Sequence, residues 1–191
     1  LYGPRSLLVA AVSVFSCVTA EYLASRLAHL PHSLSDFSAI VSGLVIALLC
    51  PVTVPLWIVC VMGGVAMLLA KTVFGGLGHN PFNPSAAALA FATVAWPGYM
   101  LKFPLPFQKI SLFNPLANTS LKIGQSILST IKLGGKLSYR ISEILFGTVP
   151  EAMGVSALLV ILACFIYLVV RKTIEWRITF SYLGTVAVLS A

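Results

Sequence analysis

Charged side chains are scarce in this sequence. Asp, Glu, Lys and Arg make up 9% of its 191 residues, whereas a typical soluble domain carries about 25%. Hydrophobic residues make up 59%, and the mean hydropathy is +0.99. A chain with so few polar groups cannot cover a surface that faces water, so the composition excludes an ordinary soluble domain. It predicts an integral membrane protein with room for about six spans of roughly 20 residues each.

Acidic residues are the rarest charged type, with five Asp and Glu against 12 Lys and Arg. The net charge of +7 would suggest nucleic-acid binding in a soluble protein, but no basic stripe is interleaved with aromatics, so we expect none. The basic residues lie mostly between apolar segments, where such side chains anchor to lipid headgroups and set topology. They are Arg26, Lys71, Lys102, Lys109, Arg171, Lys172 and Arg177. Their distribution over alternate loops leaves the membrane orientation open.

Metal-binding and nucleotide-binding motifs are also missing. The four cysteines form no CxxC pair or other metal-ligand spacing, so no metal site is expected, and they suit small apolar packing positions. No GxGxxG turn in a βαβ context is present, so the sequence does not predict direct NAD binding.

Long apolar runs dominate what is present. They predict an all-α, polytopic transmembrane helical bundle with broken helices. Pro51 and Pro55 divide the apolar run 37–70, which would be about 51 Å long as one helix and therefore too long for one crossing. The chain starts at Leu1 and stops within an apolar run, so we expect a single membrane domain, 1–191, that is part of a longer subunit. The predicted spans are 6–24, 37–50, 56–71, 85–100, 152–170 and 178–191, with a polar loop at 101–150.

The segment 75–84 reads GGLGHNPFNP and interrupts the apolar pattern. Its glycines and prolines forbid a regular helix, and Asn83 with Pro84 predicts the N-terminus of a new one. Irregular backbone at membrane depth is tolerated only where it is buried or lines a polar cavity. The segment is therefore either a site for a polar or anionic group, a constriction for an ion, or an ordinary turn outside the membrane. The candidate site residues are Gly75, Gly76, Gly78, Asn80 and Asn83.

Two acidic residues stand at span ends. Glu21 is costly within a membrane unless it is paired or functional, so it is a candidate for an ion or proton path; a plain interfacial position is the alternative. Asp36, just before a span, is expected to be the N-cap of that helix. Aromatic residues near span ends are typical of an interfacial belt. They are Trp57, Trp96, Tyr99, Trp176 and Tyr182.

The run Gly75–Ser85 closely resembles the GGLGxNPFNPA signature of a family of membrane proteins. This family contains the RnfD component of Rnf-type ion-translocating electron-transport complexes and its counterpart, the NqrB component of the Na⁺-translocating NADH:quinone reductase. Residues 38–48, SAIVSGLVIAL, resemble the family's SAxxTGLLLAL helix, and Trp96-Pro97 and Gly184-Thr185-Val186 resemble later helices. The short connections favour the RnfD side of the family.

The resemblance implies a fragment of a subunit of about ten spans built as an inverted repeat. It implies an enzyme only as part of a complex, a translocase and oxidoreductase that passes electrons through flavin and couples them to Na⁺ or H⁺ movement. It also implies a multi-pass protein of the bacterial inner membrane, with the Rnf-type A, B, C, E and G subunits as partners. A channel or secondary transporter component without a redox role is the alternative that broken helices also suit.

The resemblance further implies FMN attached through its phosphate to a threonine in an SGATPL-like motif, with riboflavin as a second flavin. This sequence has no Ser-Gly-Ala-Thr. Alignment of Lys132-Leu133-Gly134 with the family's LKxG places Ser126 at the threonine's position, and Thr130 is the other candidate. An ordinary Ser/Thr turn without attached flavin remains the alternative.

Overall fold

The computed structural model describes residues 2–27, 36–76, 79–108, 110–112, 123–124, 140–155 and 158–190. These residues are mostly helical, which confirms the all-α class. Among them, a single antiparallel pair of short strands, β1 (Phe103–Pro104) and β2 (Ile123–Gly124), follows the N-terminal helices.

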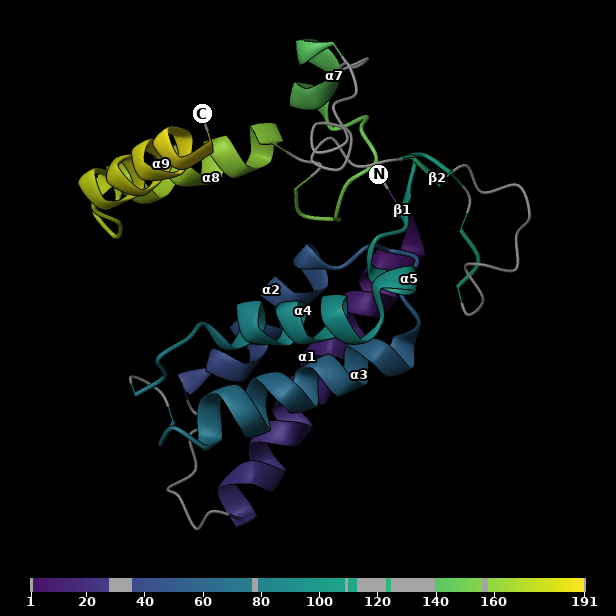
Figure 1. Ribbon diagram of the computed structural model, residues 1–191, viewed down its shortest axis with the longest axis vertical. Helices are drawn as coiled ribbons and strands as arrows, with labels where there is room; N and C mark the ends of the chain where they lie inside the picture. The colour runs from purple at the N-terminus through teal and green to yellow at the C-terminus, as the bar shows by residue number, and fades with distance from the viewer. Residues whose placement is uncertain are drawn as a thin grey trace.

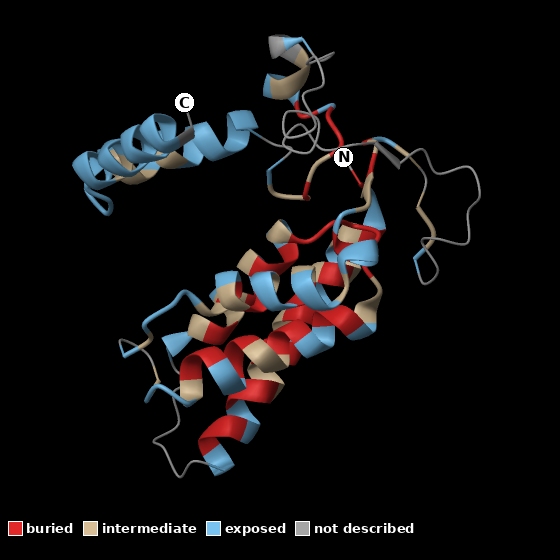
Figure 2. Ribbon diagram, in the orientation of Figure 1, coloured by how far each residue is buried: buried red, intermediate tan, exposed pale blue. Residues whose placement is uncertain are grey.

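The N-terminal helices form a bundle (Figure 1). Helix α1 packs against α2, against α3 and against η2, a π-helix that continues α3, while α4 packs against η2 and α2. The core between them is made of apolar and small residues such as Val9, Ile46, Met62 and Ala88 (Figure 2). The helices are α1 (Pro4–Leu27), α2 (Ser38–Leu49), α3 (Leu56–Gly64), η2 (Val65–Thr72) and α4 (Pro84–Ala95).

Proline and asparagine residues mark where several helices begin and end. Helix α2 ends and α3 begins on either side of the turn that contains Pro51 and Pro55, where the sequence predicts a break. Asn83 is the N-cap of α4 and its side chain accepts a hydrogen bond from the Ser85 backbone N–H, which confirms the predicted helix start. Pro97 divides the segment predicted as one span, 85–100, into α4 and the short helix α5 (Pro97–Met100).

Glycine and serine let the first helices approach closely. The hydroxyl of Ser13 donates to the Gly43 carbonyl oxygen at 2.7 Å, and that of Ser16 donates to the Cys60 carbonyl oxygen at 2.8 Å. A Cβ atom added at Gly43 would lie 2.7 Å from the Val14 Cα atom. Small residues at the contact therefore allow α1 and α2 to meet at backbone distance, as is common between membrane helices.

Arg5 fastens the start of α1 to the turn between α2 and α3. Its guanidinium donates to the carbonyl oxygens of Val52 and Val54, both at 2.8 Å, and to those of Ser111 and Leu112. The side chain is fully buried. The structure thus buries Arg5 as a clamp on backbone carbonyl oxygens.

The C-terminal helices extend away from the bundle as a hairpin (Figure 1). The hairpin is formed by α8 (Leu158–Val170) and α9 (Trp176–Ser190), and the short helix α7 (Ile141–Phe146) precedes it in the chain. Phe165 of α8 and Phe180 of α9 meet edge to face at 6.4 Å. Most residues of α8 and α9 are exposed, unlike those of the bundle (Figure 2).

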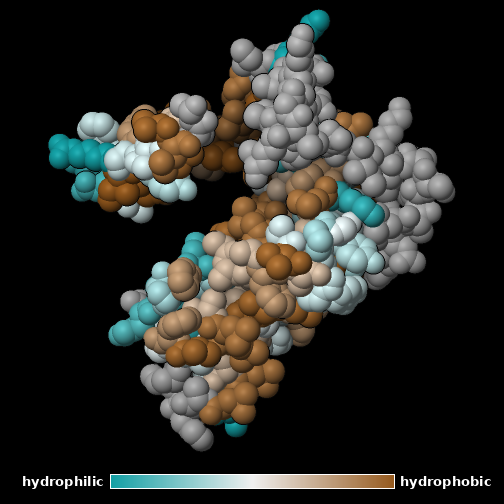
Figure 3. All heavy atoms as spheres, in the orientation of Figure 1, coloured by the Kyte–Doolittle hydropathy of each residue, from teal (hydrophilic) through white to brown (hydrophobic). Residues whose placement is uncertain are grey.

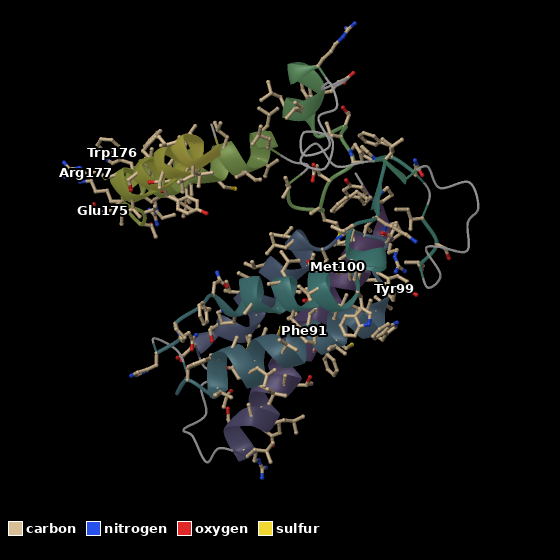
Figure 4. All side chains as sticks on the ribbon, in the orientation of Figure 1. Phe91, Tyr99, Met100, Glu175, Trp176 and Arg177 are labelled. Carbon is tan, nitrogen blue, oxygen red and sulfur yellow. The ribbon has the colours of Figure 1, made fainter. Side chains whose placement is uncertain are left out.

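Aromatic side chains gather near helix ends. Trp96, between α4 and α5, packs edge to face against Trp57 at 5.1 Å and against Phe91 at 5.8 Å. Phe91 and Tyr99 lie on the bundle, whereas Trp176 lies at the outer tip of the hairpin (Figure 4). The predicted interfacial belt stays a prediction, because these positions fix no membrane boundary.

The face of the bundle that Figure 3 shows is largely apolar. Leu7, Phe15 and Val94 are exposed by 73%, 71% and 84%, as suits a surface in contact with lipid or other membrane helices. Among the described residues, α1 alone is a helix of at least 18 residues that is apolar enough to cross a membrane. The other apolar helices are shorter, so the number of crossings stays a prediction.

Candidate functional site: a polar groove at the helix break

A groove lies between the start of α2 and the irregular segment that precedes α4. Its volume is about 620 Å³. Its polar lining comes from two places, residues 36–42 before and within α2, and residues 80–85 at the break. The polar lining residues are Asp36, Ser38, Ser42, Asn80, Asn83 and Ser85; the apolar ones are Val41, Val45, Pro81, Phe82 and Pro84.

Hydrogen bonds fix the break against α2. The Asn83 Oδ1 atom accepts from the Ser85 N–H at 3.0 Å, and the Ser85 hydroxyl donates to the Ser42 carbonyl oxygen at 3.0 Å. Ser85 is 2% exposed. The N-terminus of α4 is thereby held beside α2, so the groove has a rigid wall.

Asn80 supplies a buried polar atom to the groove. Its Oδ1 atom is buried and has no hydrogen-bond partner among the described residues. Such an atom costs about 1–3 kcal/mol when left unsatisfied. A ligand that donates a hydrogen bond would satisfy it, and the amide of Asn80 can both donate and accept.

The glycines of the signature act through the backbone. Gly75 and Gly76 have φ angles of 98° and 92°, in the region that favours glycine, and their N–H groups donate to the carbonyl oxygens of Thr72 and Lys71. They terminate η2 and are not among the residues that line the groove. Gly78 lies outside the described residues.

Behind the groove, Glu21 of α1 and Lys71 of η2 form a buried ion pair. Both residues are 3% exposed. The Lys71 ammonium also donates to the Ser38 hydroxyl at 2.6 Å, and Ser38 lines the groove. Glu21 is thus paired with Lys71 inside the bundle, and Lys71 is not an exposed headgroup anchor as its position in the sequence suggested.

Asp36 does not cap α2. The N-cap position is Phe37, which has a left-handed backbone conformation with φ 51°, and no side chain makes a capping hydrogen bond there. The turn at Phe37 instead leaves Asp36 on the groove wall. The predicted N-cap is wrong because the chain turns sharply one residue before the helix begins.

The candidate flavin attachment residues, Ser126 and Thr130, lie outside the described residues. Within the part of the chain that the structure describes, no cluster of three or more His, Cys, Asp or Glu side chains could hold a metal ion.

Sequence reasoning found Asn80, Asn83 and Glu21 but missed Asp36, Ser38 and Lys71 as neighbours of the same site. One signal was available for Lys71: it is the single charge within the predicted span 56–71, and a charge in a span needs a partner. Ser38 is the first residue of the run 38–48 that resembles the family's helix, but that resemblance gave it no role at the site.

Comparison with known proteins gives a consistent result along the whole chain. The NQR2, RnfD, RnfE family matches residues 1–191. The chain is 34% identical over 195 residues to the D subunit of the Na⁺-translocating ferredoxin:NAD⁺ oxidoreductase complex of Acetobacterium woodii, with 100% of this chain and 58% of the relative covered. It is 27% identical to the D subunit of the proton-translocating ferredoxin:NAD⁺ oxidoreductase complex of Clostridium ljungdahlii, covering 99% and 57%.

A third relative is the D subunit of the ion-translocating oxidoreductase complex of Methanosarcina acetivorans, 33% identical with 93% of this chain and 51% of the relative covered. The chain therefore spans somewhat more than half the length of these curated relatives. Its composition, its apolar exterior and this similarity together make it a membrane protein.

Proposed function

Because this chain belongs to the NQR2, RnfD, RnfE family, we propose that it is part of a membrane subunit of an Rnf-type, ion-translocating ferredoxin:NAD⁺ oxidoreductase complex in the bacterial inner membrane. The subunit passes electrons through flavin and couples their passage to the movement of Na⁺ or H⁺. One relative is named for Na⁺ and another for protons, so similarity alone does not select the ion. The matched helix break with its polar groove is the observation that carries this proposal.

The groove suits a flavin ring. Its volume of about 620 Å³ is within the range of about 300–1,000 Å³ typical of cofactor and ligand pockets. The buried Oδ1 atom of Asn80 offers an acceptor to a ring N–H, while Ser38 and Asn83 add polar groups beside an apolar wall. When bound, flavin would supply the one- and two-electron chemistry, and these residues would hold and orient its ring. FMN attached at Ser126 or Thr130, and riboflavin in the groove, are the forms we propose.

Glu21 is the proposed residue of the ion path. It is a buried carboxylate in a membrane bundle, and such groups are rare and commonly functional. Its pairing with Lys71 keeps the site neutral at rest, and Ser38 connects the pair to the groove.

Asn80→Leu tests the flavin site in the full-length subunit, purified within its complex. Flavin content should fall while the thermal unfolding temperature stays near that of the unaltered protein, because no described hydrogen bond is lost. Asn83→Ala, by contrast, should lower stability by about 1 kcal/mol through loss of the helix cap. Protein that carries no flavin at all and shows only solute flux in liposomes would refute the proposal in favour of a channel or transporter.

Partners form the second part of the proposal. A membrane protein of this family is expected to co-purify with the Rnf-type A, B, C, E and G subunits, and ferredoxin and NAD⁺ should act on those partners. Gentle solubilisation and mass spectrometry of a tagged full-length protein would check this; isolation as a stable lone monomer contradicts it.

A further inference from the structure

Lys71 is the physical link between the buried carboxylate and the groove. Its ammonium contacts Glu21 on one side and the Ser38 hydroxyl on the other, at 2.6 Å. Ser38 lines the groove, and so does Asp36. A change of charge in the groove therefore acts on the Lys71 ammonium across a single hydroxyl group.

The backbone that carries Lys71 is unusual. It lies in η2, a π-helix of eight residues, in which the Val73 N–H donates to the Leu68 carbonyl oxygen and the Thr72 hydroxyl donates to the Met67 carbonyl oxygen. Long π-helices are rare, and π turns occur frequently at functional sites. A return to α-helical bonding would rotate Lys71 relative to α1.

We propose that Lys71 is a movable counter-charge that couples the charge of the groove to the charge of Glu21. This rests on the proposed function, in which the groove holds flavin. When an electron from a flavin or iron–sulfur carrier of a partner protein adds negative charge to the groove, the ammonium shifts from Glu21 towards Ser38. The Glu21 carboxylate then takes up one monovalent cation, Na⁺ or H⁺, so one electron gained is balanced by one cation.

The direction of this coupling follows from the cost of buried charge. A carboxylate left without its counter-ion inside a membrane bundle is strongly destabilised, so it binds a cation readily. When the electron leaves, Lys71 returns to Glu21 and competes with the bound cation, which is released. Coupling free energies between sites commonly change affinity by about 5- to 150-fold, and a value near tenfold is sufficient here.

Four variants of the full-length subunit in its complex, reconstituted in liposomes, test the proposal. They are Lys71→Met, Glu21→Gln, the double variant Glu21→Gln with Lys71→Met, and Lys172→Met as the exposed control. We would measure cations moved per electron, with radioactive Na⁺ in one arm and a pH-sensitive dye in the other, so that the two ions are distinguished. The bound flavin's midpoint potential would be measured in parallel.

Lys71→Met should largely abolish the movement of cations per electron, because the coupling charge is removed, and it should lower the flavin potential, because a nearby positive charge is lost. Glu21→Gln should raise that potential, and Lys172→Met should change neither quantity. If the complex with Lys71→Met does not assemble, the double variant provides the test instead. Its two neutral side chains at positions 21 and 71 should allow assembly, but electron transfer should still move no cations. The proposal would be overturned if the double variant again moved cations in proportion to electrons. It would also be overturned if Lys71→Met left either the number of cations per electron or the flavin midpoint potential unchanged.

Failure of the proposed function would look different. In that case the unaltered complex itself would lack flavin, and Asn80→Leu would change nothing. If the unaltered complex holds flavin and pumps cations while Lys71→Met retains both flavin and coupling, the counter-charge role alone is wrong.

Discussion

Replacement of Gly43 by alanine is expected to force α1 and α2 apart. The new Cβ atom would lie 2.7 Å from Val14 Cα, 3.0 Å from Val14 N and 3.1 Å from the Ser13 carbonyl oxygen. All three are backbone atoms of α1, so no rotamer change relieves the overlap. Separation of the helices would also lengthen the hydrogen bond from the Ser13 hydroxyl to the Gly43 carbonyl oxygen, now 2.7 Å.

The size of the effect follows from opposing contributions. Overpacking costs about 1–3 kcal/mol, and a weakened hydrogen bond adds about 1 kcal/mol. Alanine gains about 0.5–1 kcal/mol over glycine within a helix. Gly43→Ala should therefore lower the free energy of unfolding by about 1–3 kcal/mol.

Gly64 and Gly63 provide matched comparisons on α3. A Cβ atom at Gly64 would meet no other atom within 4 Å, so Gly64→Ala should be neutral or slightly stabilising. At Gly63 the Cβ atom would lie 2.9 Å from Ser16 Cβ, so Gly63→Ala should also lower the free energy of unfolding. Adding Ser16→Gly to that variant removes the contacting side chain and should recover part of the lost stability. No side-chain truncation offers the same relief to Gly43→Ala.

Titration of the full-length subunit with a denaturing detergent, followed by far-ultraviolet circular dichroism, measures these differences. The reasoning is refuted if Gly43→Ala unfolds at the same detergent fraction as Gly64→Ala. It is also refuted if Ser16→Gly adds its own cost to Gly63→Ala with no favourable coupling.

Three further predictions concern other regions. Arg5→Lys keeps the charge but cannot donate to as many carbonyl oxygens. The free energy of unfolding, measured by the same detergent titration, should fall by about 1.5–3 kcal/mol for each charge-assisted hydrogen bond lost. Stability equal to that of the unaltered protein would contradict the role of Arg5 as a clamp. Cys60 is exposed and Cys17 is buried, so a membrane-permeant maleimide should label Cys60 first, as peptide mass spectrometry would show; equal rates would contradict the packing. Mass spectrometry of the peptide 123–132 should show an FMN adduct that Ser126→Ala or Thr130→Val removes; an unmodified peptide would exclude covalent flavin.

Features that depend on a few neighbouring residues were predictable from the sequence. The break between α2 and α3 falls at the turn containing Pro51 and Pro55, and α4 begins after Asn83 with Pro84 in its first turn, because proline and asparagine act through their own backbone and side chain. The candidate site was located on the same grounds, since the glycines and proline of 75–83 oppose a regular helix through their own backbone. The same reasoning wrongly predicted Asp36 as the N-cap of α2, because the chain turns at Phe37, which takes the N-cap position instead.

The partner of Glu21 could be narrowed but not identified from the sequence. Arg5 is 16 residues away on the same helix, or about 24 Å along its axis, which is too far for contact. Arg26 is close in sequence, but its guanidinium lies over the Tyr22 ring and donates to the Tyr22 hydroxyl. Lys71 reaches Glu21 because the fold brings η2 against α1. Tertiary packing thus selects Lys71 rather than Arg26 as the partner of Glu21. The same packing connects Glu21 to the groove, because Lys71 also donates to the Ser38 hydroxyl.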